Sequence, residues 1–380
     1  MDRIFHFSAP GRTEICGNHT DHQHGCVLAA AVDMETRADV RLNGSSIIRV
    51  RSEGYAPVEI DTGYLKIRED ERNTTAALVR GMAAAFAERG CILHGFDAEV
   101  SSTVLPGSGL SSSAAFEVLI GRILNELFYD GRLSAIEIAQ AGQYAENVYF
   151  GKPCGLMDQM ASSVGGLVYI DFNNPEDPIV RKIDFDFAHS GYTLCIIDSG
   201  ADHSDLTAEY SAIPYELKKL CTVMGREYLR DVDECEFYAR LPGLRRAAGD
   251  RAVLRAMHVF DENRRVQAQV KALSDGDFCT FLKGINESGL SSWLYLQNVI
   301  PAGRPSHQEM AFTLALCRKL LDGDGAVRVH GGGFAGTVLA FVPDAQFEIF
   351  KVSVEAVGEV LPRRSADRRA HFTVIRPVVL

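Results

Sequence analysis

The chain has 380 residues, of which 46% are hydrophobic and 23% are charged. This composition is typical of globular proteins and excludes a disordered or fibrous one. The 39 basic and 50 acidic side chains leave a net charge of −11. Nucleic acids and anionic membranes attract cationic surfaces, so we expect neither as a partner.

Membrane insertion and secretion are also not expected. The apolar stretches, such as residues 27–32, are far shorter than the ~18 residues that a transmembrane helix needs. Residues 1–12 show no basic segment followed by an apolar core, so we predict no signal peptide. The nine cysteines form no Cys-x-x-Cys pair, which indicates free, mostly buried thiols and a cytoplasmic location.

In chain order, the first clear element is a strand at residues 96–100, where apolar and polar side chains alternate. A serine- and glycine-rich segment at 105–115 follows. Apolar residues then recur at helical spacing, so the serines lie where a helix begins. Ser134 and Glu137 form a capping box for a second helix.

The second half of the chain mixes both kinds of element. We predict a buried strand at residues 192–198, mainly helices from 210 to 282, and a strand at 338–342 after the glycine-rich segment 331–336. The fold class is therefore α+β. We predict two domains, 1–185 and 186–380.

Segment 105–115 is the strongest local signal for chemistry. Its glycines let the backbone approach a ligand closely, and a helix N-terminus favours anions, so the segment suits a phosphate. It lacks the Gly-Lys-[Ser/Thr] ending of a Walker A loop and the third glycine of a Rossmann fingerprint. The alternative is an ordinary strand-to-helix turn capped by serines.

A second polar cluster occupies residues 9–25. Its three histidines, His19, His22 and His24, suggest zinc, but no cysteine or acidic residue stands at a recognisable ligand spacing. The arginine, aspartate and amide groups favour a polyhydroxylated ligand together with an anion. The alternative is a solvated loop.

A third candidate is Asp158, which lies among small and apolar residues in segment 151–159. A buried aspartate needs a partner or a task. Glu146 closes the preceding capped helix, and taken alone a glutamate in this position is more often a surface residue of the helix.

Together these segments resemble the GHMP family of small-molecule kinases, and more narrowly the galactokinases. Residues 11–22 follow the galactokinase signature with substitutions, and residues 106–114 match the family's phosphate loop. The motif Gly-x-Met-Asp-Gln recurs at 155–159 and Gly-Gly-Gly-Phe-x-Gly at 331–336. A further family segment resembles residues 203–210, from His203 to Tyr210.

The resemblance implies an N-terminal part like ribosomal S5 domain 2, a ferredoxin-like C-terminal part, and a site between them. It also implies small-molecule partners, ATP and a sugar, with Mg²⁺ as cofactor and phosphorylation of the anomeric hydroxyl of galactose. The site residues that it implies are Asp158 as catalytic base and Arg12 as transition-state stabiliser; Ser113 and Glu146 as magnesium ligands; Gly107, Ser108, Gly109, Leu110, Ser111, Ser112 and Ser113 as the nucleotide loop; and Asn18, His19, Asp21 and Tyr210 as sugar contacts.

The chain departs from the family pattern at four places. The signature's glutamate and asparagine are exchanged, as Asn18 and Glu14, and its tyrosine is His22. Residues 211–215 replace an Arg-Arg pair, and 288–292 match a Ser-His-x-Ser-Leu segment only loosely. Glu14 could restore, from its own position, the carboxylate acceptor that is lost at position 18. Two alternatives follow: a kinase for another hexose such as N-acetylgalactosamine, and a non-catalytic sugar sensor, which the complete serine run disfavours.

Overall fold

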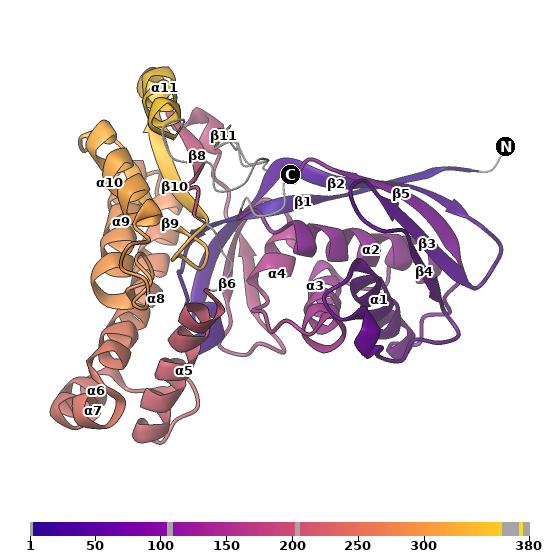
Figure 1. Ribbon diagram of the computed structural model, residues 1–380, viewed down its shortest axis with the longest axis horizontal. Helices are drawn as coiled ribbons and strands as arrows, with labels where there is room; N and C mark the ends of the chain where they lie inside the picture. Colours follow the sequence, from indigo (N-terminus) through magenta and orange to yellow (C-terminus); the bar gives the residue numbers. More distant parts are fainter. Residues whose placement is uncertain (1–2, 105–108, 202–205, 359–371, 375–380) are drawn as a thin grey trace. The chain divides into compact units, whose positions relative to one another are not determined.

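The computed structural model describes residues 3–104, 109–201, 206–358 and 372–374. Helices and strands are mixed along the chain (Figure 1), so the predicted α+β class is confirmed. The chain forms two compact units. The first contains the residues up to Thr13 and Ala30–Gly166, and the second contains Glu14–Ala29 and Leu167–Val379. The predicted domains, 1–185 and 186–380, stay a prediction, because compact packing units need not coincide with domains.

The first unit contains a twisted sheet with the strand order β4-β3-β5-β2, and β1 pairs with β2. β5 runs antiparallel to β2 and parallel to β3, and β3 and β4 are antiparallel. The prediction of a strand at 96–100 is confirmed by β5. The bounds are β1 (Phe5–Cys16), β2 (Cys26–Leu42), β3 (Ile47–Ser52), β4 (Val58–Asp61) and β5 (Phe96–Ser102), and β1 and β2 each continue into the second unit.

Helices gather on one face of this sheet (Figure 1). The core between them contains Phe86, Phe96 and Ile120, all fully buried. The prediction of a helix at the serine run is confirmed, and so is the capping box, in which Ser134 and Glu137 bond reciprocally. The helices are α1 (Thr75–Glu88), α2 (Ser112–Phe128), α3 (Ala135–Tyr144), a π-helical turn η3 (Ala145–Phe150) and α4 (Met157–Val164).

The second unit contains a four-stranded antiparallel sheet with the order β11-β8-β10-β9. Its β8 spans the predicted strand 192–198, and β10 contains the predicted strand 338–342. A second pair, β6 and β7, is also antiparallel, and β6 neighbours β2. The bounds are β6 (Leu167–Asp171), β7 (Ile179–Lys182), β8 (Tyr192–Asp198), β9 (Ala326–His330), β10 (Thr337–Pro343) and β11 (Phe372–Val374).

The helices of the second unit confirm the helical periodicity predicted for 210–282. The 25-residue α8 packs against α5 and α9, and α9 and α10 pack against β9. The core under β9 and β10 includes Leu314, Val329 and Ala340. The bounds are α5 (Thr207–Met224), α6 (Glu234–Ala239), α7 (Leu241–Ala248), α8 (Asp250–Ser274), α9 (Phe278–Ser291), a π-helical turn η6 (Ser292–Leu296), α10 (Glu309–Leu321) and α11 (Phe347–Gly358).

The cysteines behave as predicted. All nine are free, and only Cys235 and Cys279 are exposed. None of the helices in the described ranges combines the length and the apolar character needed to cross a bilayer.

Candidate active site

Two residues that are 146 positions apart in the sequence form an ion pair in the first unit. Arg12 of β1 donates from Nε to Oδ1 of Asp158 at 2.7 Å and from Nη2 to Oδ2 at 2.6 Å. Asp158 lies in the first turn of α4, and the third guanidinium nitrogen of Arg12 donates to the carbonyl of Gly109. The side chain of Arg12 is 8% exposed and that of Asp158 is 32% exposed. The guanidinium of Arg12 is therefore buried and held by three hydrogen bonds, whereas the carboxylate of Asp158 keeps part of its surface open.

The surroundings of Asp158 keep its carboxyl group ionised. Burial alone would raise its pKa, but the charge and hydrogen bonds of Arg12 outweigh burial, with help from Ser111 and Lys152. The pKa of Asp158 is therefore lower than its ordinary value. Such a carboxylate accepts a hydrogen bond readily but holds a proton weakly. It can orient a hydroxyl group from the start and take the proton only as the oxygen forms its new bond.

The predicted nucleotide loop approaches this pair from the N-terminus of α2. Gly107 and Ser108 lie outside the described residues. Gly109 has φ +77° and Ser111 has φ +57°, a left-handed conformation that is costly for serine. The Ser111 side chain makes no helix-capping bond and interacts with Asp158 instead.

The loop is held against β1. The carbonyl of Leu110 accepts a hydrogen bond from the backbone N–H of Arg12 at 3.0 Å. A Cβ on Gly11 would lie 3.1 Å from that carbonyl oxygen, so glycine permits the close approach. The remaining loop residues, Ser112 and Ser113, are half-buried in the first turn of α2, where helix N–H groups and the helix dipole favour a phosphate.

Glu146 is not the surface residue that its sequence position also allowed. Its side chain is 5% exposed and lies in η3, and π-helical turns of this kind are frequent at functional sites. Its Oε2 accepts a hydrogen bond from Nε2 of Gln159 at 2.9 Å, and its Oε1 lies 3.5 Å from Nζ of the exposed Lys152. A buried carboxylate and the Ser113 hydroxyl are hard oxygen donors, and these fit Mg²⁺, which takes few protein ligands and keeps several waters.

Sequence reasoning missed Glu117 and Gln159. Both are fully buried, and Nε2 of Gln159 also donates to Oε2 of Glu117 at 2.9 Å. Burial, followed by the charge of Glu146, raises the pKa of Glu117 well above its ordinary value. One signal was present in the sequence: Glu117 is a lone charged residue in the otherwise apolar run from Ala114 to Ile120.

The predicted sugar contacts lie in the second unit. His19 bonds through Nε2 to the carbonyl of Gly332 at 3.1 Å, and the hydroxyl of Tyr210 donates to the carbonyl of Gly333 at 2.8 Å. Both side chains are thereby brought to the glycine-rich segment 331–336. Burial raises the pKa of Tyr210 to about 12, so the phenol is neutral at physiological pH. Asp21 begins a short 3₁₀ turn, η1 (Asp21–Gln23), and is half-buried; His203, part of the family segment that ends at Tyr210, lies outside the described residues.

The three histidines of segment 9–25 do not converge on one point. The ring of His19 bonds to that of His22, with Nδ1 and Nε2 3.1 Å apart, whereas His24 stacks on Tyr228. Burial, and then His22, lowers the pKa of His19 to about 3. Within the described ranges, no group of three or more His, Cys, Asp or Glu side chains is arranged to hold a metal ion.

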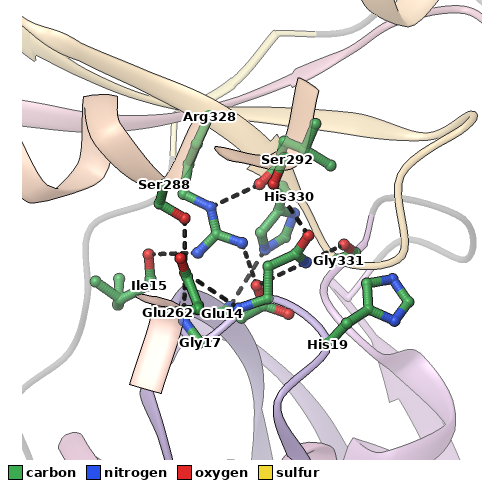
Figure 2. A network of polar contacts seen from close by, with 12 residues as sticks. Glu14, Ile15, Gly17, His19, Glu262, Ser288, Ser292, Arg328, His330 and Gly331 are labelled. Carbon is green, nitrogen blue, oxygen red and sulfur yellow. Dashed lines mark hydrogen bonds and ion pairs between the residues drawn. The ribbon is translucent and has the colours of Figure 1, made fainter. Parts of the chain in front are cut away.

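The exchanged residues Glu14 and Asn18 belong to one buried network (Figure 2). Glu14 forms an ion pair with the fully buried Arg328. The Asn18 amide nitrogen donates to Oε1 of Glu14 at 3.1 Å and to the carbonyl of Gly331 at 2.6 Å. Its oxygen accepts from Asn298 at 2.9 Å and from Ser292 at 3.3 Å. Since these four bonds use both hydrogens and both lone pairs of the amide, a sugar contact by Asn18 would have to displace one of them.

Helix α8 also forms hydrogen bonds to the segment that contains Gly17 and Asn18. Oε1 of Glu262 accepts hydrogen bonds from the backbone N–H groups of Gly17 and Asn18 and from Ser288. Nε2 of His258 bonds to the carbonyl of Asn18 at 2.9 Å. These polar residues on a buried helix face were also missed, because helical periodicity does not reveal which partner a buried charge will meet.

Comparisons with known proteins agree with this geometry. Residues 2–42 match the galactokinase galactose-binding signature, and residues 77–166 match the GHMP kinases N terminal domain. A galactokinase of Streptomyces coelicolor is 32% identical over 365 residues, covering 94% of this chain and 90% of that protein. One of Actinobacillus pleuropneumoniae is 32% identical over 352 residues, covering 90% of this chain and 85% of that protein.

Solved structures show the same fold. The structure of Lactococcus lactis galactokinase complexed with galactose superposes with a TM-score of 0.83 at 24% identity, covering 99% of this chain and 94% of that one. Mevalonate kinase of Methanococcus jannaschii superposes with a TM-score of 0.68 at 12% identity, covering 100% and 99%. The predicted GHMP-kinase fold is therefore confirmed, and the chain belongs to the galactokinase family.

Proposed function

We propose that the protein transfers the γ-phosphoryl group of ATP to the anomeric hydroxyl of galactose, giving galactose 1-phosphate and ADP. The observation that carries this proposal is the bidentate pair of Arg12 and Asp158 beside the loop that opens α2. Phosphoryl transfer depends on an oriented hydroxyl, neutralised charge and in-line geometry, and this pair with its loop supplies groups suited to the first two.

In the proposed reaction the anomeric oxygen forms a bond to the γ-phosphorus, and the bond from that phosphorus to the β,γ-bridging oxygen breaks. Asp158 orients the hydroxyl and accepts its proton as the new bond forms. Arg12 holds Asp158 ionised and stabilises negative charge on the transferring group. The N-terminus of α2, with Gly107–Ser113, binds the phosphates.

Ser113 and Glu146 would hold Mg²⁺, which neutralises charge on the phosphate oxygens. The sugar contacts in this proposal are His19, Asp21 and Tyr210, with Asn18 acting through the network described above. We also propose a cytoplasmic location, because nine unpaired thiols suit a reducing compartment.

The test is ADP formation with Mg²⁺ and ATP on a panel of galactose, glucose and N-acetylgalactosamine. Turnover confined to galactose is expected. Turnover on N-acetylgalactosamine alone would make the protein a kinase for another hexose. Sugar binding without ADP formation on any sugar would make it a sensor.

Asp158→Asn tests the residue roles, because it keeps the shape of the side chain and removes the charge. We expect galactose binding to persist, as measured calorimetrically, while kcat falls at least ~100-fold. Asp130→Asn, at an exposed position, is the matched control. Near-normal turnover of Asp158→Asn would remove Asp158 from the role of base.

A further inference from the structure

Three polar side chains from three different helical segments meet in the interior of the first unit. Glu117 comes from α2, Glu146 from η3 and Gln159 from α4. Glu117 and Gln159 are fully buried, and Glu146 is 4% exposed. Gln159 immediately follows Asp158 in the chain, so the group is covalently tied to the proposed active site.

The hydrogen bonds fix the orientation of the Gln159 amide. Its Nε2 lies 2.9 Å from a carboxylate oxygen of Glu117 and 2.9 Å from one of Glu146. The ionised carboxylate of Glu146 only accepts hydrogen bonds, and an oxygen of Glu117 can accept one whether or not that carboxyl group is protonated, so the NH₂ group faces both, with one hydrogen for each. The amide oxygen of Gln159 and Oε1 of Glu117 have no hydrogen-bond partner among the described residues. The Gln159 amide therefore bridges the two carboxyl groups, and the Cys154 side chain also contacts Gln159 at 3.7 Å and hydrogen-bonds to Glu146.

Close packing holds the cluster in place. A Cβ on Gly142 of α3 would lie 3.0 Å from Cγ of Gln159 and 3.1 Å from Oε2 of Glu117. A side chain at position 142 would therefore press against both groups, and glycine lets them lie close to α3. Buried groups packed this closely cannot change rotamer without moving a helix.

The two oxygens of Glu146 have different surroundings. Oε2 is bound to Gln159 inside the unit, whereas Oε1 lies 3.5 Å from Nζ of Lys152, whose side chain is 64% exposed. One oxygen is thus anchored by a buried donor, and the other faces a long side chain that solvent can replace.

We propose that Gln159 and Glu117 are positioning residues that fix the carboxylate of Glu146 so that its Oε1 is presented to the magnesium ion. Gln159 holds Oε2 of Glu146, and Glu117 holds the second hydrogen of the Gln159 amide, which prevents the amide from turning. This inference rests on the proposed function, in which Glu146 is a magnesium ligand. Groups that orient a metal ligand typically change metal affinity 10- to 100-fold when they are removed.

The first test replaces the bridging donor. Gln159→Leu keeps the approximate shape of the side chain but donates no hydrogen bond. We measure Mn²⁺ binding, as a paramagnetic substitute for Mg²⁺, by electron paramagnetic resonance in the presence of a non-hydrolysable ATP analogue. Gln159→Leu should weaken Mn²⁺ binding roughly 10- to 100-fold. Binding of the analogue without metal should not change.

The control is Gln143→Leu, because Gln143 donates to the carbonyl of Cys154 at 3.2 Å and bonds neither carboxylate. The Mn²⁺ affinity of Gln143→Leu should stay within about threefold of that of the native protein, because Gln143 does not orient the carboxylate of Glu146. If Gln159→Leu does not fold, Gln159→Met, with a more flexible apolar chain of similar length, replaces it.

The second test separates orientation from simple packing. Glu117→Gln keeps an acceptor for the Gln159 amide, so Mn²⁺ affinity should be retained, whereas Glu117→Leu removes the acceptor and should lower it. A purely structural role would make both substitutions affect thermal stability while leaving metal affinity unchanged. With Gln159→Leu, the Mg²⁺ concentration for half-maximal activity should rise while KM for galactose stays constant.

Unchanged Mn²⁺ affinity in Gln159→Leu would overturn this inference while leaving the proposed kinase activity standing. Failure of the native protein to bind Mn²⁺ with the ATP analogue would instead overturn the proposed function itself. The two failures are therefore distinguishable in one experiment.

Discussion

Glu262 offers a direct measurement of how strongly α8 holds the segment that contains Gly17 and Asn18. Its carboxylate is fully buried and accepts hydrogen bonds from the N–H groups of Gly17 at 3.1 Å and Asn18 at 3.3 Å and from Ser288 at 2.6 Å. Its other oxygen pairs with Arg265. The substitution Glu262→Gln keeps the size and one acceptor but removes the charge.

The expected cost follows from the pKa of this group. Burial alone would raise it, but Arg265, with His258 and Arg328, lowers the pKa of Glu262 from 4.5 to about 2. At about 1.4 kcal/mol for each tenfold change in proton affinity, this corresponds to about 3 kcal/mol of stability at neutral pH. Because the folded pKa is the lower one, this stability is present above pH 4.5 and is lost as the pH falls through about 2.

The assay is urea unfolding followed by fluorescence of Trp293, the one tryptophan of the chain, which lies in η6 of the second unit. Glu262→Gln should lower the unfolding free energy by about 3 kcal/mol at pH 7, and the difference should be clearly smaller at pH 3. Glu236→Gln, in an exposed pair with Arg240, is the control and should change little. A difference below ~1 kcal/mol at pH 7, or one that stays constant from pH 7 to pH 3, would refute the reasoning.

Three further predictions concern the site. Arg12→Lys cannot make the bidentate pair, so kcat should fall roughly 100-fold; a loss of less than threefold in steady-state assays would contradict the role of Arg12. Asn18→Asp places a second carboxylate beside Glu14, so kcat/KM for galactose should fall while no other hexose of the panel becomes a substrate; turnover on another hexose would instead make residue 18 a direct sugar contact. Because burial and then His22 lower the pKa of His19 to about 3, its imidazole should stay neutral down to about pH 4 in ¹⁵N NMR spectra, and titration near pH 6.5 would show that the ring is exposed.

Local sequence patterns were sufficient to predict the elements that carry the site. The capping box at Ser134, the strand at 192–198 and the start of α2 depend on short-range signals, and the structure confirms each of them. The backbone of Ser111 could not be predicted, because nothing local demands a left-handed serine. Its conformation follows from the loop being held between Arg12 and Asp158.

Contacts between residues that are far apart in the sequence could not be predicted. Motif matching singled out Arg12 and Asp158 separately, but their pairing joins β1 to α4 and is visible only in three dimensions. Glu117 and Gln159 were missed for the same reason, since a buried glutamate in an apolar helix face and a glutamine after a motif aspartate reveal their roles only when placed together.

The exchange of acid and amide between positions 14 and 18 is also explained by a contact with a residue that is far away in the sequence. Read locally, the exchange suggests a changed sugar contact. In the structure, the acid at position 14 balances the charge of Arg328, which is fully buried and lies 314 residues away in the sequence.

The amide at position 18 is needed because it must donate to the carbonyl of Gly331 and accept from Asn298 at the same time, which no carboxylate can do. With acid and amide in the reverse order, a carboxylate would face that carbonyl. Arg328 would then face an amide that carries no charge, which is costly for a fully buried cation. The two departures are therefore one structural unit with Arg328, and the physical demand that they meet is internal charge balance in the second unit.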